Sequence, residues 1–375
     1  MNLRADIFEQ INQSIGRMSK YKPGAGKEEI ADEYGLDEII KLSSNENPLG
    51  CADEVRQALN EKQFHYARYP DGECRALREK LAEFYNLDFE NVIVGNGSDQ
   101  IIDLAAELVT EPGDEILMGD PTFAKYQLTC HALGVKPVKV ELDENFRHDL
   151  KAMQEAITER TRVIFICDPN NPTGTTVSEG ELKDFLDEIR DDILVVIDQA
   201  YCEYVTADDY FGGIDSLKDY PNLLVLRTFS KIYGLAALRV GYGLGNSEII
   251  EHLHRIRNPF NVNAVAQLAA ARALECQKHV EKCREMNAGQ RRLFAEKFEE
   301  FGLEYVDSQA NFMIVDTGLS SGEAFEHFAR RGVVVRSVKS FGLDRWIRFT
   351  LPPADKSEKV LKAFSELPAL LEKGV

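Results

Sequence analysis

The chain has 375 residues, enough for two domains of ordinary size and for a core that needs no disulfide or metal ion. Its net charge of −19 argues against a nucleic-acid partner, because phosphate backbones are bound by basic surfaces. No apolar run approaches the ~20 residues of a membrane span, the N-terminus lacks a signal-peptide pattern, and the seven cysteines are scattered without a CxxC pair, so we expect a cytoplasmic protein without a metal site.

The first two thirds of the chain begin with a polar arm, residues 1–48, and continue as helical patterns that alternate with short apolar runs. The helical patterns cover 52–62, 76–85, 98–109 and 178–189. The apolar runs cover 92–94, 115–117, 135–140, 163–166, 193–197, 223–226 and 240–243. Continuous β-branched runs separated by helices predict an α/β fold, with a mostly parallel central sheet flanked by helices on both faces.

The last third of the chain mixes longer helices with short strands. A helical pattern starts at 266–286 and continues to about residue 300. Shorter elements follow at 311–315, 323–331, 333–336, 346–350 and about 355–371. We therefore expect an N-terminal arm that is part of the small domain (1–48), a large cofactor-binding domain (49–262) and a small α+β C-terminal domain (263–375).

Polar and unusual segments follow five of the predicted strands. They read GNGSDQ, GDPTF, CDPNNPTG, DQAY and RTFSK. Ligands of open parallel sheets bind beyond the carboxyl ends of the strands, so these segments predict one shared site.

Lys231 lies in an apolar run, TFSKIYGLAALRVGY (228–242). Burial among apolar neighbours lowers the pKa of an amine and frees it as a nucleophile, and forming a Schiff base with an aldehyde cofactor is the main use of such a lysine. The ordinary alternative is a lysine whose stem is buried and whose ammonium reaches water.

Asp198 ends a buried run, where a carboxylate is costly unless it is paired. A protonated pyridine nitrogen is a suitable partner, and pyridoxal phosphate takes up electrons when that nitrogen holds its proton. Asn171 and Tyr201 could hydrogen-bond the phenolate oxygen of the same ring. Each residue alone also has a structural explanation, namely a helix cap, an ion pair or a turn.

The remaining segments supply donors for an anion and a flat apolar surface. A helix N-terminus binds anions through its unpaired N–H groups, and hydroxyl and guanidinium groups add to it. The candidates for the phosphate of the cofactor are Gly97, Ser98, Asp99, Thr228, Ser230 and Arg239. Phe123 could lie on the ring of the cofactor, although an aromatic residue at a strand end is more often core.

With these residues the chain resembles the fold-type-I pyridoxal-phosphate aminotransferases and, within them, the class II subfamily of histidinol-phosphate aminotransferases. The resemblance covers nearly the whole length. It rests on LSSNENPLG (42–50), YPDGECRALREKLA (69–82), VGNGSDQII (94–102), DPTFAKY (120–126), DPNNPTG (168–174), DQAYCEY (198–204), LRTFSKIYGLAALRVGYG (226–243), RNPFNVN (257–263) and VVVR with WIRFT (333–350).

The resemblance implies roles in binding pyridoxal 5′-phosphate. Lys231 would form the aldimine and carry the proton, Asp198 would pair with the pyridinium nitrogen, and Asn171 and Tyr201 would hold the 3′-oxygen. Phe123 would stack on the ring, and Ser98, Asp99, Thr228, Ser230 and Arg239 match the region around the phosphate. Tyr69 matches a tyrosine that such homodimers donate to the cofactor phosphate of the neighbouring subunit.

The resemblance also implies residues that bind anionic substrates. Arg348 matches an arginine that clamps a carboxylate, and Arg336 one that binds the phosphate of histidinol phosphate or the distal carboxylate of 2-oxoglutarate. Asn171 and, on the arm, Tyr21 complete the predicted substrate set. Two departures leave the substrate open: Gln199 stands where the family usually has glutamate, and Lys339 adds a cation to the unusual loop RSVKSFGLDRW (336–346).

The activity implied is transamination of L-histidinol phosphate with 2-oxoglutarate, giving imidazole acetol phosphate and glutamate in histidine biosynthesis. The alternatives are an aromatic amino-acid aminotransferase, a threonine-phosphate-type decarboxylase on the same fold, or, from a different class, a non-catalytic regulatory protein that binds pyridoxal phosphate. We expect small anionic substrates, a homodimer, and neither nucleic acid nor membrane as partner.

Overall fold

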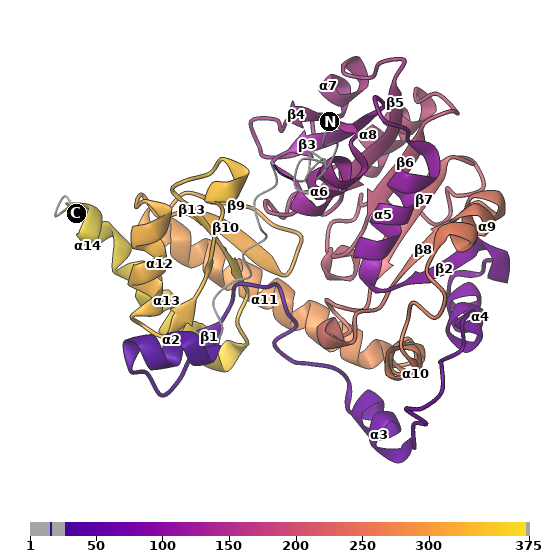
Figure 1. Ribbon diagram of the computed structural model, residues 1–375. Helices are drawn as coiled ribbons and strands as arrows, with labels where there is room; N and C mark the ends of the chain where they lie inside the picture. The colour runs from indigo at the N-terminus through magenta and orange to yellow at the C-terminus, as the bar shows by residue number, and fades with distance from the viewer. Residues whose placement is uncertain (1–15, 17–26, 373–375) are drawn as a thin grey trace, which may run out of the picture.

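The computed structural model describes residues 16 and 27–372 and confirms the expected α/β class (Figure 1). A large seven-stranded sheet lies in one part of the molecule, and two smaller sheets lie in the other part with the C-terminal helices. In the described residues, no helix combines the length and the apolar character needed to cross a membrane.

The large sheet has the strand order β2-β8-β7-β6-β5-β3-β4. Its strands are β2 (Val92–Gly95), β3 (Glu115–Asp120), β4 (Lys136–Glu141), β5 (Thr161–Cys167), β6 (Leu194–Asp198), β7 (Leu223–Thr228) and β8 (Gly241–Gly245). Only β8 is antiparallel to its neighbours, β2 and β7, and so the other six strands all point the same way. Their carboxyl ends therefore lie at one edge, where β8 begins.

Alternate residues of the buried strands enter two different hydrophobic cores. In β5, Val163 and Phe165 face one side of the sheet, whereas Ile164 and Ile166 face the other. Successive side chains of a strand point to opposite faces, which explains why an unbroken apolar run is needed where helices cover both faces.

Different helices cover the two faces of the large sheet. One face carries α5 (Gly97–Val109), α6 (Ala124–Leu133) and α9 (Ser247–Ile256). The other face carries α3 (Asp53–Glu61), α4 (Arg75–Tyr85), α7 (Leu150–Glu155), α8 (Glu179–Asp187) and α10 (Ala264–Ala273). The helix α10 follows the proposed boundary at residue 262 and still packs against α3 and α4.

The second part of the molecule joins the two ends of the described chain. Its antiparallel sheet has the order β12-β13-β10-β9, and a separate two-stranded sheet pairs β1 in parallel with β11. These strands are β1 (Ile40–Lys41), β9 (Tyr305–Val306), β10 (Phe312–Asp316), β11 (Val333–Val334), β12 (Arg336–Ser337) and β13 (Trp346–Thr350). The pairing of β1 with β11 supports the proposal that the arm belongs to the small domain.

Among the described residues, five helices accompany these strands, and one of them reaches both parts of the molecule. They are α2 (Lys27–Tyr34), α11 (Gln277–Phe301), α12 (Ser321–Ala329), α13 (Ser357–Ser365) and α14 (Leu367–Glu372). On α11, Val280 and Cys283 pack into a core of the large sheet, whereas Phe294 and Phe298 pack into the core of the second part. This helix therefore packs against both parts of the molecule (Figure 1).

Three predicted elements are divided in the structure. The pattern from 266 breaks between α10 and α11, where the buried Leu274 holds the chain against the large sheet before α11 leaves it. The run VVVR divides into β11 and β12, because the two strands have different partners. The final helix divides at Glu366 into α13 and α14, because Pro368, the second residue of α14, has no N–H with which to continue the hydrogen bonds of α13.

Candidate functional site

A cavity of about 770 Å³ opens at the carboxyl edge of the large sheet, beside β12 and β13. Thirteen of the fifteen predicted site residues line it: Gly97, Ser98, Asp99, Phe123, Asn171, Asp198, Tyr201, Thr228, Ser230, Lys231, Arg239, Arg336 and Arg348. The sequence therefore predicted the position of the cavity, because the last residues of parallel strands share one edge of the sheet.

Lys231 follows β7 and reaches the cavity as a half-buried amine. Its Nζ lies 3.4 Å from the carbonyl oxygen of Ser44 and 5.5 Å from the centre of the Tyr201 ring. Burial, followed by the positive charge of Arg348, lowers the pKa of this amine to about 8. At neutral to mildly alkaline pH, a substantial fraction of the amine is therefore unprotonated and nucleophilic.

Asp198 is the last residue of β6 and is 2% exposed. Its Oδ2 accepts a hydrogen bond of 3.0 Å from the Tyr126 hydroxyl, and its Oδ1 accepts one of 3.2 Å from the backbone N–H of Ala200. Burial raises the pKa of the carboxyl to about 6, and the Tyr126 bond opposes that rise. The carboxylate is thus ionised at pH 7 and lines a cavity in which a cation could pair with it.

Tyr126 was not singled out from the sequence, although it lies in the motif DPTFAKY. It is fully buried, its ring stacks on Phe165 with 4.6 Å between centroids, and Phe123 contacts it edge to face. These aromatic contacts hold the hydroxyl against Asp198. The sequence offers one indication of this contact. Tyr126 stands three residues after Phe123, which is about one helical turn, so the two rings could lie on the same side of the helix.

Asn171, Tyr201 and Arg348 meet at one wall of the cavity, although β13 is remote in sequence. A guanidinium nitrogen of Arg348 donates to Oδ1 of Asn171, which leaves the amide nitrogen of Asn171 facing the Tyr201 hydroxyl at 3.5 Å. Arg348 also donates to the Ser43 carbonyl oxygen at 3.1 Å. The arginine therefore decides which way the Asn171 amide points.

The opposite end of the cavity collects anion-binding groups around the start of α5. Gly97 has φ +72°, and a Cβ there would lie 2.9 Å from a guanidinium nitrogen of Arg239, so glycine permits this close approach. Arg239 precedes the antiparallel β8 and pairs with Asp99 at 3.0 Å. Hydroxyls of Thr228 and Ser230 line the same cavity. The first N–H groups of α5 have no partner within the helix, which suits an anion.

These groups match the donor set that pyridoxal phosphate needs. An anion-binding end, a buried carboxylate for a ring nitrogen, two donors for a phenolate oxygen and a reactive amine share one cavity. Gly97 lets the guanidinium of Arg239 come close to the start of α5, which suits a phosphate. The lowered pKa of Lys231 suits an amine that condenses with an aldehyde.

Arg336 and Arg348 lie directly opposite each other on β12 and β13, and both line the cavity. Directly opposed residues of neighbouring strands share a face, and like charges in such pairs repel. The two guanidinium groups therefore lie on one wall of the cavity, where an anionic ligand could contact both.

The two departures from the family pattern do not line the cavity. Lys339, an exposed residue, pairs with Asp344 at 3.2 Å. Gln199 is fully buried, accepts hydrogen bonds from Arg227 at 2.9 and 3.2 Å, and donates to the Phe211 carbonyl oxygen at 2.7 Å. Ser340 and Phe341, from the same loop as Lys339, do line the cavity and were not predicted.

Two predicted residues are not brought to the cavity of this chain. Tyr69 is 81% exposed, and its ring stacks on Phe260 with 4.5 Å between centroids. An exposed position suits the expected contact with a neighbouring subunit. Tyr21 lies outside the described residues.

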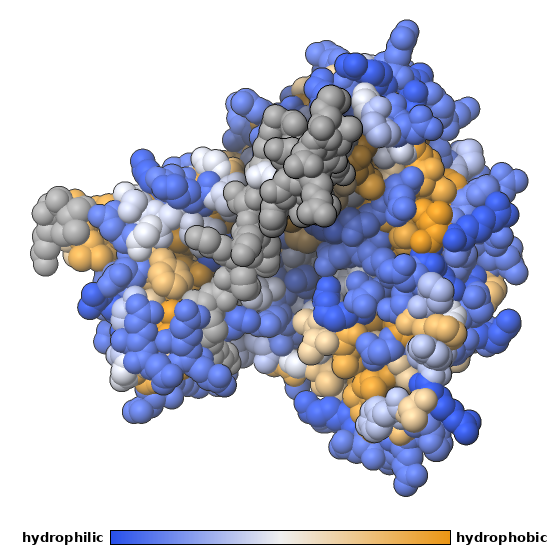
Figure 2. All heavy atoms as spheres, viewed as in Figure 1, coloured by the Kyte–Doolittle hydropathy of each residue, from blue (hydrophilic) through white to orange (hydrophobic). Residues whose placement is uncertain are grey.

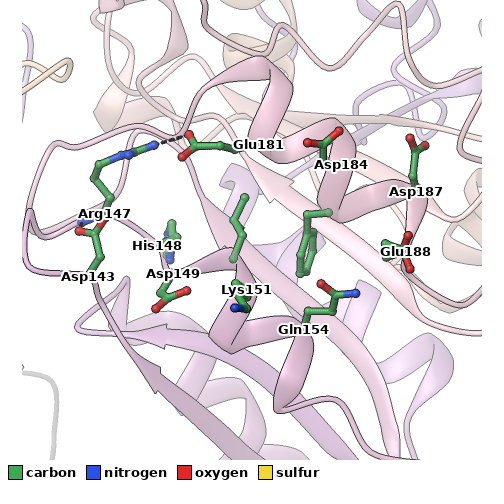
Figure 3. A pocket seen from close by; sticks show the side chains of 12 residues that line it. Asp143, Arg147, His148, Asp149, Lys151, Gln154, Glu181, Asp184, Asp187 and Glu188 are labelled. Atoms are coloured by element: carbon green, nitrogen blue, oxygen red, sulfur yellow. Dashed lines mark hydrogen bonds and ion pairs between the residues drawn. The ribbon is translucent and has the colours of Figure 1, made fainter.

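A second cavity, of about 600 Å³, lies between α7 and α8, away from these residues (Figure 3). Its lining is mainly acidic and includes Asp149, Asp184, Asp187 and Glu188. None of the predicted site residues belongs to this lining.

Asp168, at the end of β5, is a second buried carboxyl, and it should make stability fall as the pH rises. It is 0% exposed, Oδ1 accepts from the backbone N–H of Val177 at 3.2 Å, and among the described residues Oδ2 has no hydrogen-bond partner. Burial raises its pKa from 3.8 to about 8. Because the folded-state pKa is the higher one, the stabilisation is complete below pH 4 and is lost as the pH rises to 8.

We therefore expect Asp168→Asn to remove this part of the pH dependence. Urea unfolding of the cofactor-free protein between pH 5 and 8 should show the variant gaining on the wild type by up to roughly 1.4 kcal/mol per pH unit. A difference that does not change with pH would contradict the raised pKa.

Comparison with known proteins gives a consistent result over nearly the whole chain. The family model described as aminotransferase class I and II matches residues 37–366. The histidinol-phosphate aminotransferase of Moorella thermoacetica is 45% identical over 96% of this chain and 93% of its own, and that of Caldicellulosiruptor saccharolyticus is 43% identical over 96% and 100%. The crystal structure of histidinol-phosphate aminotransferase from Sinorhizobium meliloti in complex with pyridoxal-5′-phosphate superposes with a TM-score of 0.85 at 26% identity, covering 95% of this chain and 100% of that one.

Proposed function

Because this chain belongs to the class I and II aminotransferase family, we propose that it uses pyridoxal 5′-phosphate to transfer the amino group of L-histidinol phosphate to 2-oxoglutarate. The products are imidazole acetol phosphate and glutamate, and the reaction belongs to histidine biosynthesis. The observation that carries the proposal is the joining, in one cavity, of the Lys231 amine, the Asp198 carboxylate and two arginines in register. The names of the curated relatives support the choice of substrate.

When bound, the cofactor supplies an aldehyde that condenses with amines and a ring that accepts the electron pair released at the substrate carbon. Lys231 is the residue positioned to take the proton from that carbon and to return it, because its amine has a pKa of about 8 and lines the cavity. A general base works best when its pKa lies near the working pH.

Asp198 would keep a proton on the ring nitrogen, because leaving a buried charge without its partner is strongly unfavourable. Asn171 and Tyr201 would donate to the 3′-oxygen, the donors around Gly97 and Arg239 would hold the phosphate, and Phe123 would lie against the ring. Each of these residues binds or orients the cofactor, and only Lys231 moves a proton at the substrate.

Arg336 and Arg348 bind the anionic ends of two different substrates in turn. A planar guanidinium can donate two parallel hydrogen bonds either to a phosphate or to a carboxylate. Histidinol phosphate and 2-oxoglutarate have an anionic end in common and otherwise differ in shape. A site that admits both in a ping-pong reaction therefore needs groups that bind this anionic end.

The substrate assignment is tested by half-reactions with histidinol phosphate, phenylalanine and threonine phosphate, followed by the absorbance of the bound cofactor. The wild-type protein should react fastest with histidinol phosphate. Arg336→Ala should lower kcat/KM for histidinol phosphate by about 10- to 150-fold, the value of a hydrogen bond to a charged group, and that for phenylalanine much less.

Lys339→Ala is the matched control, because it removes a neighbouring exposed cation that is paired with Asp344. It should leave both substrates nearly unaffected. Equal losses for histidinol phosphate and phenylalanine in Arg336→Ala would contradict phosphate recognition, and carbon dioxide release from threonine phosphate would favour the decarboxylase.

We also propose a homodimer in which Tyr69 binds the cofactor phosphate of the neighbouring subunit. Tyr69 lies between α3 and α4, and Figure 2 shows hydrophobic residues exposed where these helices lie with α10, as one of several apolar patches on this face. The scattered cysteines suit a reducing compartment, and we propose the cytoplasm as the location.

Removal of the Tyr69 hydroxyl should weaken the binding of pyridoxal phosphate without changing the fold. We expect Tyr69→Phe to raise Kd by about 10-fold or more, because a hydrogen bond to a dianion is lost. Tyr66→Phe, in the same exposed segment, is the control and should bind normally. Sedimentation equilibrium should give a dimer for both variants, and a monomeric wild-type protein would refute the proposal.

A further inference from the structure

Asn45 lies at the point where the N-terminal segment crosses between the two parts of the molecule. It is 1% exposed, lines the cavity and has φ +54°, a left-handed conformation that few residues other than glycine and asparagine adopt readily. A polar side chain buried in such backbone needs specific partners.

The backbone of Asn45 is held by the C-terminal sheet. Its N–H donates to the Thr350 hydroxyl at 2.9 Å, and its carbonyl oxygen accepts from the Asn311 amide at 3.1 Å. The adjoining carbonyl of Ser44 accepts from Lys231, and that of Ser43 from Arg348. The segment 43–45 therefore touches the amine, the substrate arginine and the small sheet together.

The side chain of Asn45 is directed to the large sheet, where Nδ2 donates to the Tyr201 hydroxyl oxygen at 3.1 Å. A tyrosine hydroxyl has one proton to give and can accept two hydrogen bonds. Asn45 and, at 3.5 Å, Asn171 both approach that oxygen with N–H groups. The hydroxyl proton is then left for an acceptor inside the cavity.

We propose that Asn45 is a positioning residue that turns the Tyr201 hydroxyl toward the 3′-oxygen of the cofactor. The inference rests on the proposed function and adds a residue whose effect passes through Tyr201. It also assigns a role to the LSSNENPLG segment. Because the small sheet holds the backbone of Asn45, the position of that sheet sets where the Asn45 amide meets the Tyr201 hydroxyl.

A double-mutant cycle between Asn45→Gly and Tyr201→Phe tests the proposal in the full-length protein. Glycine keeps the left-handed backbone and removes the amide. The readouts are Kd for pyridoxal phosphate added to the cofactor-free protein, and the midpoint of the pH titration of the absorbance of the bound cofactor. Asn45→Gly should raise Kd about 10-fold when Tyr201 is present, and less than about 2-fold in the Tyr201→Phe background.

The midpoint of the absorbance titration should behave in the same way. Loss of the donor to the 3′-oxygen should move it to higher pH in Asn45→Gly and in Tyr201→Phe, with no further movement in the double variant. Asn311→Ala is the control, because Asn311 donates to the backbone carbonyl oxygen of Asn45, so its loss loosens the same segment and leaves the Asn45 amide in place. Its effect should be equal with and without the Tyr201 hydroxyl.

Independent, additive losses for Asn45→Gly and Tyr201→Phe would overturn the role of Asn45. If Asn45→Gly is poorly folded, Asn45→Asp replaces it in the same cycle. The carboxylate introduced by Asn45→Asp can accept a hydrogen bond from Tyr201 but cannot donate one. Wild-type affinity for pyridoxal phosphate in this variant would therefore show that the donor of Asn45 is not needed, and this result would overturn the proposal. Failure of the wild-type protein to bind pyridoxal phosphate would refute the proposed function itself.

Discussion

Replacing Lys231 with alanine should abolish transamination, with a fall in kcat of at least about 10⁴-fold, because one residue supplies both the nucleophile and the proton carrier. The amine lies in the cavity with a pKa of about 8, the value expected of a group that both gives and takes protons near neutral pH. The fold should survive, since the chain loses a half-buried charge and no ion pair of Lys231 is found among the described residues.

Borohydride reduction followed by peptide mapping provides a readout independent of turnover. The wild-type protein should retain pyridoxal phosphate covalently at Lys231, and Lys231→Ala should retain none. Lys339→Ala is the control, because its exposed ammonium pairs with Asp344 outside the cavity, and it should be labelled at Lys231 as usual. Labelling at another lysine in Lys231→Ala would refute the assignment.

Replacing Asp198 with asparagine should lower kcat by about 10²- to 10⁴-fold, since breaking a buried charge pair costs about 3–5 kcal/mol. Asparagine keeps the shape and an oxygen that can accept the Tyr126 hydrogen bond, but it has no charge to hold a proton on a ring nitrogen. The affinity for pyridoxal phosphate should also fall, because the cofactor loses its ionic partner.

The stability of the cofactor-free protein separates this chemical role from a structural one. Burial raises the pKa of Asp198 to about 6, so the ionised carboxyl costs the folded state free energy above that pH. Asp198→Asn should therefore be at least as stable as the wild type at pH 8 in urea unfolding. Asp168→Asn, which changes another fully buried carboxyl outside the cavity lining, should keep nearly normal kcat. Equal loss of activity in both variants would contradict a special role for Asp198.

The residues that follow the strands could be predicted because their chemistry is local. Asp198, Asn171 and Lys231 each lie within a few residues of a recognisable apolar run, and the parallel order of the strands brings their ends together without further information. Arg239 joins them because β8 runs against its neighbours, so the residue before that strand lies at the same edge.

Other residues could not be assigned because their roles depend on partners distant in sequence. Tyr126 reaches Asp198 across 72 positions of the chain, and Asn45 is anchored by Thr350 across 305. Both lie in motifs that the sequence displays, yet nothing in a motif says which way a hydroxyl or an amide points. The division of VVVR between two sheets could not be predicted for the same reason, because the partners of β11 and β12 are remote in sequence.

The sequence alone therefore determined the fold class, the family and most of the predicted residues that line the cavity, because strand periodicity and the residues after each strand are local properties. Only the tertiary structure decided that Arg336 and Arg348 stand in register, that Lys339 and Gln199 lie outside the cavity, and that Asn45 contacts Tyr201. These features depend on strand register and on hydrogen bonds between remote segments, and such relations arise when the two parts of the molecule pack together.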